Sequence, residues 1–214
     1  MTRARDIADN RGGLFLLGTK SVLSAAADTT SLQLNNVFSA NFQNYKIVFD
    51  IVAVADGSRS TQTGFFMGFG NSGTIRTSGD VWEGVIQYAQ SSAGATDSSF
   101  SSKATDSCGI MGTFTTQGAY ITGHSIVRNP FSSTAPHEVK TEGCMHYPNE
   151  AAGQYPENSV NVTTAANFST TDVNFQGVTN IVTDNSAAND VSALTKINMY
   201  GVFKVYGIEG SFNA

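Results

Sequence analysis

The chain has 214 residues, of which 40% are hydrophobic, so it is long enough to bury a full core within one domain. Its formal net charge is −5 at pH 7 and only 14% of its residues are charged, which argues against nucleic acid as a partner because phosphate binding needs clustered Lys and Arg. No apolar run reaches the ~20 residues of a membrane-spanning helix, and the charged N-terminus lacks the apolar segment of a secretory signal, so we expect folding in a cytoplasm without membrane insertion.

The N-terminus is a polar segment in which basic and acidic side chains alternate. Such a segment cannot bury a core of its own, so we predict an arm over residues 1–12 that docks on another subunit or on a different protein. In this arm, three guanidinium groups would pair with carboxylates and one apolar side chain would fill a pocket. The residues are Arg3, Arg5 and Arg11 for the ion pairs and Ile7 for the pocket.

Strand signals begin directly after the arm. Residues 14–17 and 32–34 are short apolar stretches bounded by turn residues, and each predicts a short strand. Val37, Phe38 and Phe42 follow as large apolar side chains that we expect in the core.

The strongest strand signal is the stretch 44–54. One of its faces would be wholly apolar and the other would mix charge with valine, as in a strand near the middle of an antiparallel sheet. A second alternating stretch, 196–207, lies near the C-terminus, and we expect the two strands to be neighbours in one sheet. The apolar face of the first strand consists of Tyr45, Ile47, Phe49, Ile51 and Ala53.

The middle of the chain alternates between strand signals and long polar stretches. Residues 64–70 and 81–90 predict strands, the first with glycines that indicate close backbone packing. Residues 91–107 and 148–167 are rich in small polar residues, Asn, Gly or Pro, and we interpret both as long exposed loops. Loops of that length are functional or loosely ordered.

Further strands complete the fold prediction. Residues 108–116 and 119–128 resemble a strand pair joined by a Gln-Gly turn, 138–147 alternates cleanly, and 173–182 reads as one broken strand. No helical period persists over ten residues, while strand signals recur every 8–15 residues. The pattern predicts an all-β fold, an antiparallel sandwich or barrel formed by a single domain over residues 13–214.

The search for catalytic chemistry is mostly negative. The histidines are His124, His137 and His146, and the first and last could approach each other if their strands pair, with Cys144 or Glu142 completing a metal or Cys-His site. The spacing matches no known ligand motif, so we favour scattered surface or hydrogen-bonded histidines. We assign no catalytic residue, no metal ligand and no cofactor.

The other chemical motifs are equally weak. Cys108 and Cys144 are favoured as free thiols over a bridge, because the chain is expected to fold in a cytoplasm. Residues 68–73 fit the Gly-x-Gly-x-x-Gly pattern but precede no helix, so a nucleotide site is rejected on context. Carboxylates give no recognisable pair for sugar hydrolysis. Four aromatic residues could stack on sugar rings, although packing in the core or at a subunit interface is the favoured interpretation. They are Trp82, Tyr120, Tyr147 and Tyr155.

Four segments, in this order and at this spacing, resemble small virion proteins of tailed bacteriophages, especially those of marine and cyanobacterial hosts. The opening, residues 1–9, is similar to their N-terminus, and residues 42–48 resemble the Asn-Tyr-Lys/Arg start of their central strand. Residues 126–131 are similar to a mid-chain strand ending in Asn-Pro, and residues 197–202 resemble their closing strand.

The resemblance implies a jelly-roll-like β-sandwich from a tail fibre or a capsid surface. It offers no catalytic residues, and because coiled-coil heptads and shaft repeats are missing from the sequence, it favours a compact module over a fibre shaft. We therefore expect a non-catalytic structural protein of the virion, made in the host cytoplasm. A tail-fibre or receptor-binding module is the first interpretation, a capsid decoration (cement) protein is the alternative, and a glycan depolymerase is a third.

The same resemblance implies the partners. We expect other virion proteins of the tail or capsid, further copies of this chain in a homotrimer, and a host surface glycan contacted by loops 91–107 and 148–167. No nucleic acid is expected.

Overall fold

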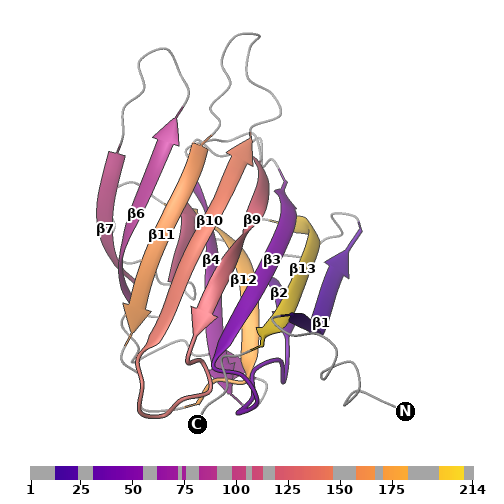
Figure 1. The fold of residues 1–214 in the computed structure, drawn as a ribbon. Coiled ribbons are helices and arrows are strands. Elements are labelled where there is room, and N and C mark those ends of the chain that lie inside the picture. Colours follow the sequence, from indigo (N-terminus) through magenta and orange to yellow (C-terminus); the bar gives the residue numbers. More distant parts are fainter. Residues whose placement is uncertain are drawn as a thin grey trace.

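Every regular element that the structure describes is a β-strand paired antiparallel with its neighbours (Figure 1). The structure is a computed structural model, and no helix occurs in the part of the chain that it describes. This part comprises residues 13–23, 31–54, 62–71, 74–75, 82–90, 98–104, 108–112, 119–146, 158–166, 171–182 and 198–209. The prediction of an all-β, antiparallel fold is therefore confirmed.

The larger sheet has eight strands in the order β1-β13-β3-β9-β10-β11-β6-β7. In that order, the strands are β1 (Leu14–Val22), β13 (Met199–Ile208), β3 (Asn44–Ala53), β9 (Ala119–Arg128), β10 (His137–His146), β11 (Asn158–Ala166), β6 (Trp82–Gln90) and β7 (Ser98–Ala104). The strand with the strongest sequence signal, β3, thus lies directly beside the closing strand β13, as predicted.

The smaller sheet has the order β2-β12-β4-β5, and β8 also pairs with β4. In Figure 1 it is drawn behind the larger sheet. Its strands are β2 (Ser31–Leu34), β12 (Asn174–Val182), β4 (Gln62–Asn71), β5 (Thr74–Ile75) and β8 (Cys108–Gly112). Buried side chains from both sheets meet in one hydrophobic core.

The alternation of β3 decides which side chains enter this core. Its predicted apolar face is buried without exception, from Tyr45 to Ala53. On the opposite face Val48 and Val52 are half-buried and Asp50 is exposed. Since successive side chains of a strand point to opposite sides of the sheet, the period-two pattern of the sequence fixes this outcome.

A chain of aromatic rings runs through the core and joins the two sheets. Consecutive ring centroids lie between 4.8 and 6.4 Å apart, mostly in tilted or edge-to-face arrangements. Such geometries are those that aromatic quadrupoles favour. The order is Phe15, Phe42, Tyr45, Phe38, Phe69, Phe175, Phe203 and Phe49.

The predicted hairpin of residues 108–116 with 119–128 is wrong. β8 pairs with β4 in the smaller sheet, whereas β9 pairs with β3 and β10 in the larger one. A short Gln-Gly linker favours pairing between sequence neighbours. However, β9 buries Ile121 and Val127 beside the fully apolar face of β3, and this long-range packing decides the partner.

The two predicted long loops are also wrong in part, because each contains a strand. β7 lies within 91–107 and β11 within 148–167. Both strands are rich in Ser, Thr, Asn or Ala, and β11 alternates only at Val160 and Val162, so their sequences carry little strand signal even though their backbones join the ladder. In addition, the broken strand predicted over 173–182 is one continuous strand, β12. The strand predicted over 14–17 is longer than expected, because β1 extends to Val22.

Candidate functional site

The register of β9 and β10 sets the positions of His124, Cys144 and His146, and the side chain of His146 is outside the described residues. The register places His124 opposite Glu142, with 3.9 Å between Nε2 and Oε2, and Cys144, a free thiol, opposite Thr122. His146 lies opposite Tyr120, four residues and about 13 Å along the sheet from the row of His124. The structure therefore does not bring His124 and His146 together. Cys108 lies in β8, and its side chain is outside the described residues.

Charged side chains surround His124, which is partly exposed to solvent. Burial lowers the pKa of His124, and the charges of Lys46 and Lys140 lower it further, while Glu142 raises it. The hydrogen bond and charge of Lys140, whose Nζ lies 2.7 Å from a Glu142 oxygen, lower the pKa of the Glu142 carboxyl. These groups form a charged patch on the outer face of the larger sheet, and exposed ion pairs of this kind contribute little to stability.

A second histidine, His137, lies in a buried pair with Asp172 that the sequence did not reveal. The His137 and Asp172 side chains are 1% and 0% exposed, and their Nδ1 and Oδ2 atoms lie 3.0 Å apart. The other ring nitrogen, Nε2, lies 3.0 Å from the Ser132 carbonyl oxygen. A carbonyl can only accept, so Nε2 donates the proton of this hydrogen bond.

This buried pair fastens two segments that are distant in sequence. The loop between β9 and β10 supplies Ser132 and Pro130, and the segment leading into β12 supplies Asp172, whose backbone N–H donates to the Pro130 carbonyl at 2.6 Å. Since neither side chain reaches solvent, no substrate can contact them. The pair acts as an internal clamp at one end of the two sheets.

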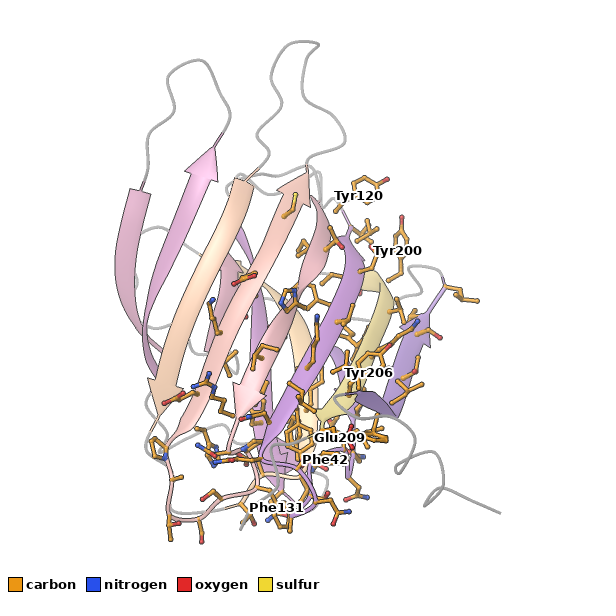
Figure 2. All side chains as sticks on the ribbon, viewed as in Figure 1. Phe42, Tyr120, Phe131, Tyr200, Tyr206 and Glu209 are labelled. Atoms are coloured by element: carbon orange, nitrogen blue, oxygen red, sulfur yellow. The ribbon has the colours of Figure 1, made fainter. Side chains whose placement is uncertain are left out.

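Two tyrosines share one row across the outer face of the larger sheet. Tyr200 in β13 lies opposite Val52 in β3, which lies opposite Tyr120 in β9. Tyr120 is 45% exposed and Tyr200 is half-buried, and Figure 2 shows both at the same end of the sheet. Two strand spacings separate them, about 9–10 Å. The next row along β3 places Asp50 beside Thr122. The residues of these two rows together form an amphipathic surface, which we call the tyrosine row.

The tyrosine row was found only in part from the sequence. Tyr120 was among the four predicted aromatic residues, but Tyr200 was not. Trp82 opens β6, far from the row in strand order, and its side chain is outside the described residues, as are Tyr147 and Tyr155 altogether.

A second exposed surface lies at the edge of the larger sheet. Among the described residues, five large hydrophobic side chains are exposed, and four of them belong to β1 or follow it directly. These four are Leu14, Leu16, Leu17 and Leu23. β1 ends the strand order, so no strand in the described ranges pairs with its outer edge.

The predicted docking residues of the arm, Arg3, Arg5, Ile7 and Arg11, lie outside the described residues. The point where the arm joins the sheet is described. The Gly13 N–H donates to Glu209 Oε2 at 3.0 Å, and the Glu209 N–H donates to the Gly13 carbonyl at 3.1 Å. Gly13, the described residue that precedes β1, is therefore held against the end of β13.

Comparison with known proteins gives no match: no protein-family model, no curated protein and no solved structure matches the chain. Within the described ranges, no three His, Cys, Asp or Glu side chains lie close enough to share a metal ion. A search of the same ranges finds no helix that is long and apolar enough to span a membrane.

Proposed function

We propose that the chain is a non-catalytic structural component of a tailed-phage virion, a surface-displayed module of tail-fibre or receptor-binding type. The sequence resemblance to small virion proteins motivates the class. The two antiparallel sheets with a shared aromatic core support a β-sandwich, and we propose a jelly-roll-like one. A rigid sheet face is a suitable platform for recognition, because its side chains hold fixed spacings.

The tyrosine row is the observation that carries the receptor-binding role. Tyrosine rings offer an apolar face for the C–H groups of a sugar and a hydroxyl for its polar edge. Tyr120 and Tyr200 stand about 9–10 Å apart, the length scale of a short oligosaccharide, with the apolar Val52 between them. Asp50 in the next row supplies a carboxylate that accepts hydrogen bonds from sugar hydroxyls. The proposed ligand is a host surface glycan.

Binding of the purified protein to host cells tests this role. Tyr120→Ala and Tyr200→Ala should each weaken binding at least tenfold, which corresponds to about 1.4 kcal/mol. Tyr206→Ala is the matched control, since Tyr206 is a half-buried tyrosine on the same strand and face as Tyr200, about 20 Å away. Equal binding by all three variants, each folded as judged by its unfolding curve, would contradict the tyrosine row as the receptor site.

A capsid decoration role is the second candidate, and the exposed edge of β1 favours it. An apolar edge next to the N-terminal arm suits a clamp between coat subunits. Gold-labelled antibody against the protein distinguishes the two roles on intact particles. Label on the tail supports the first role and label on the head supports the second. Particles without label, in a phage shown to encode the chain, would reject both.

The arm provides a further test of the virion role. Deletion of residues 1–12 should leave the unfolding free energy unchanged and abolish incorporation into particles, because the arm is proposed to dock on another subunit. Ile7→Asp in the full-length chain tests the proposed pocket alone. Normal incorporation of the truncated protein would show that the arm is not required.

The proposed assembly is a homotrimer with other virion proteins as neighbours. Light scattering on the purified protein measures its mass directly. A clean 22.6 kDa monomer at all concentrations would contradict the trimer.

A further inference from the structure

The outer face of the larger sheet is more basic than the rest of the chain. Four adjacent strands, β13, β3, β9 and β10, contain four Lys or Arg and three Asp or Glu, a net charge of +1 with histidine neutral. The whole chain has a net charge of −5. All seven charged side chains occupy the positions that alternate with buried ones, on the same face as the tyrosine row. A ligand on the tyrosine row therefore meets this charge.

Two of the four basic side chains have acidic partners. The Nζ atom of Lys140 lies 2.7 Å from a Glu142 oxygen, and Nη1 of Arg128 lies 3.5 Å from Oε2 of Glu138. Opposite charges this close largely cancel at a distance, so these pairs add little to the field that a ligand meets. The basic excess therefore rests on the two basic side chains that remain.

These two, Lys46 and Lys204, form no ion pair within the part of the chain that the structure describes. Lys204 is exposed and lies opposite Val48, and Lys46 is half-buried and lies on the diagonal, opposite Tyr206. Diagonal neighbours of this kind stand about 7–8 Å apart, so one anionic group can lie between their two ammonium groups. His124 lies on the other side of Val48. We call Lys46, Lys204 and His124 the basic cluster.

His124 senses the charge of this cluster. Burial lowers the pKa of His124 most, the charge of Lys46 lowers it further, and Glu142 raises it. The charge of Lys46 thus reaches across β3 to β9, over the surface of Val48. That surface is where the field of the unpaired lysines is strongest.

We propose that the basic cluster binds an acid group, a carboxylate or a sulfate, of the glycan that stacks on the tyrosine row, so that the ligand is an acidic oligosaccharide. The inference rests on the proposed receptor-binding function and names the chemical class of its ligand. Val48 and Val52 are four residues apart on β3, about 13–14 Å, which a short oligosaccharide can span.

Asp50 determines where the acid group can lie. It stands between the tyrosines and the basic cluster, two residues from Val48 and two from Val52. An acid group above Asp50 would meet a like charge, whereas sugar hydroxyls there donate to its carboxylate. The acid group is therefore favoured one row further on, above Val48, and the ligand ends before Tyr206. In Figure 2 this stretch of the outer face lies between Tyr200 and Tyr206.

Two variants of equal net charge test the proposal in the full-length protein. Lys204→Met removes a cation of the basic cluster, and Lys20→Met removes an exposed cation from the edge strand β1, so each changes the net charge from −5 to −6. At about 0.01 M salt, Lys204→Met should weaken binding to host cells about fivefold, the effect of an exposed ion pair, and Lys20→Met should leave it unchanged. At about 1 M salt, where the screening length falls to ~3 Å, the two variants should bind alike.

An NMR titration of His124 gives a local measurement. An anion beside the ring stabilises its protonated form, so an acidic probe should raise the pKa of His124, and Lys204→Met should reduce this rise. The probes are a galacturonic acid trisaccharide, a sulfated galactose trisaccharide and the neutral methyl ester of the first. The methyl ester should leave the pKa unchanged, and the two acidic probes show whether the cluster takes a carboxylate, a sulfate or both.

Two results would overturn the inference and leave the receptor role intact, provided that Tyr120→Ala still loses binding. One is equal binding of Lys204→Met and Lys20→Met to host cells at low salt, in variants whose unfolding curves match the parent protein. The other is a pKa of His124 that neither acidic probe raises, or that the methyl ester raises equally. Failure of the parent protein to bind host cells would instead contradict the receptor role, and this inference with it.

Discussion

Gly177 in β12 lies directly beneath the ring of Phe203 in β13, and adding one methyl group there tests how tightly the two sheets pack. A Cβ at Gly177 would lie 2.5 Å from Cζ of Phe203 and 2.9 Å from its Cε1. The ring is confined by its neighbours, with Phe175 at 5.5 Å and Phe49 at 6.4 Å between centroids. Phe203 is itself fully buried, so the ring has no open space to enter.

This contact decides whether Gly177→Ala raises or lowers the free energy of unfolding. In an uncrowded strand, Gly→Ala stabilises by roughly 0.5–1 kcal/mol, because alanine loses less backbone entropy on folding. Overpacking of a dense core instead costs about 1–3 kcal/mol. We therefore expect Gly177→Ala to destabilise the protein by about 1–2 kcal/mol, a noticeable part of the ~5–15 kcal/mol of a typical domain.

Urea unfolding measures this difference through the midpoint, with an unchanged slope as the check that the unfolded surface is the same. Phe203→Leu removes the ring atoms that the added methyl group would meet, so the double variant should be less destabilised than the sum of the single variants, with a coupling of about 0.5–3 kcal/mol. A Gly177→Ala protein as stable as the parent or more so, or strict additivity in the double variant, would refute the close packing of β12 on β13.

Three other changes give separate tests. Phe49→Ala should cost about 3–5 kcal/mol because Phe49 is 1% exposed in the core, and a loss below about 1 kcal/mol would contradict its place there. Asp172→Ala should lower the free energy of unfolding by about 3–5 kcal/mol, because it leaves the buried His137 ring without its carboxylate. As the control, Glu138→Ala removes one partner of an exposed ion pair and should lower it by less than about 1 kcal/mol. Equal losses in the two variants would refute the clamp. The pKa of His124 should lie below 6.5 in an NMR titration, chiefly because of burial. The folded protein then binds this proton less tightly than the unfolded chain, so the contribution of His124 to stability falls as pH drops through 6.5; a pKa above 6.5 would refute this reasoning.

Part of the tyrosine row could be predicted from the sequence, and part could not. Tyr120 was identified as a candidate because its aromatic ring could stack on a sugar ring. Tyr200 joins it only through the register of three strands from distant parts of the chain. The exposed edge of β1 likewise depends on strand order, since an apolar Leu-Phe-Leu-Leu run predicts a buried strand equally well.

The pairing of His137 with Asp172 in the clamp was even less predictable from the sequence. His137 and Asp172 are separated by 35 positions, and each stands alone in its local sequence, one at the start of a strand and the other in a polar run. No local pattern pairs them. They meet because the loop between β9 and β10 and the segment before β12 fold to the same end of the two sheets.

The sequence by itself determined which side chains of the strongest strands face the core. In β3 the alternation of apolar and polar residues assigned Tyr45 and Phe49 to the core, because side-chain direction along a strand is a local property with a period of two. The tertiary structure alone decided the partners of β8 and β9, the inclusion of β7 and β11, and the position of β1 at an open edge. Pairing joins segments far apart in the chain, so it depends on how whole faces pack together and not on any pattern within one strand.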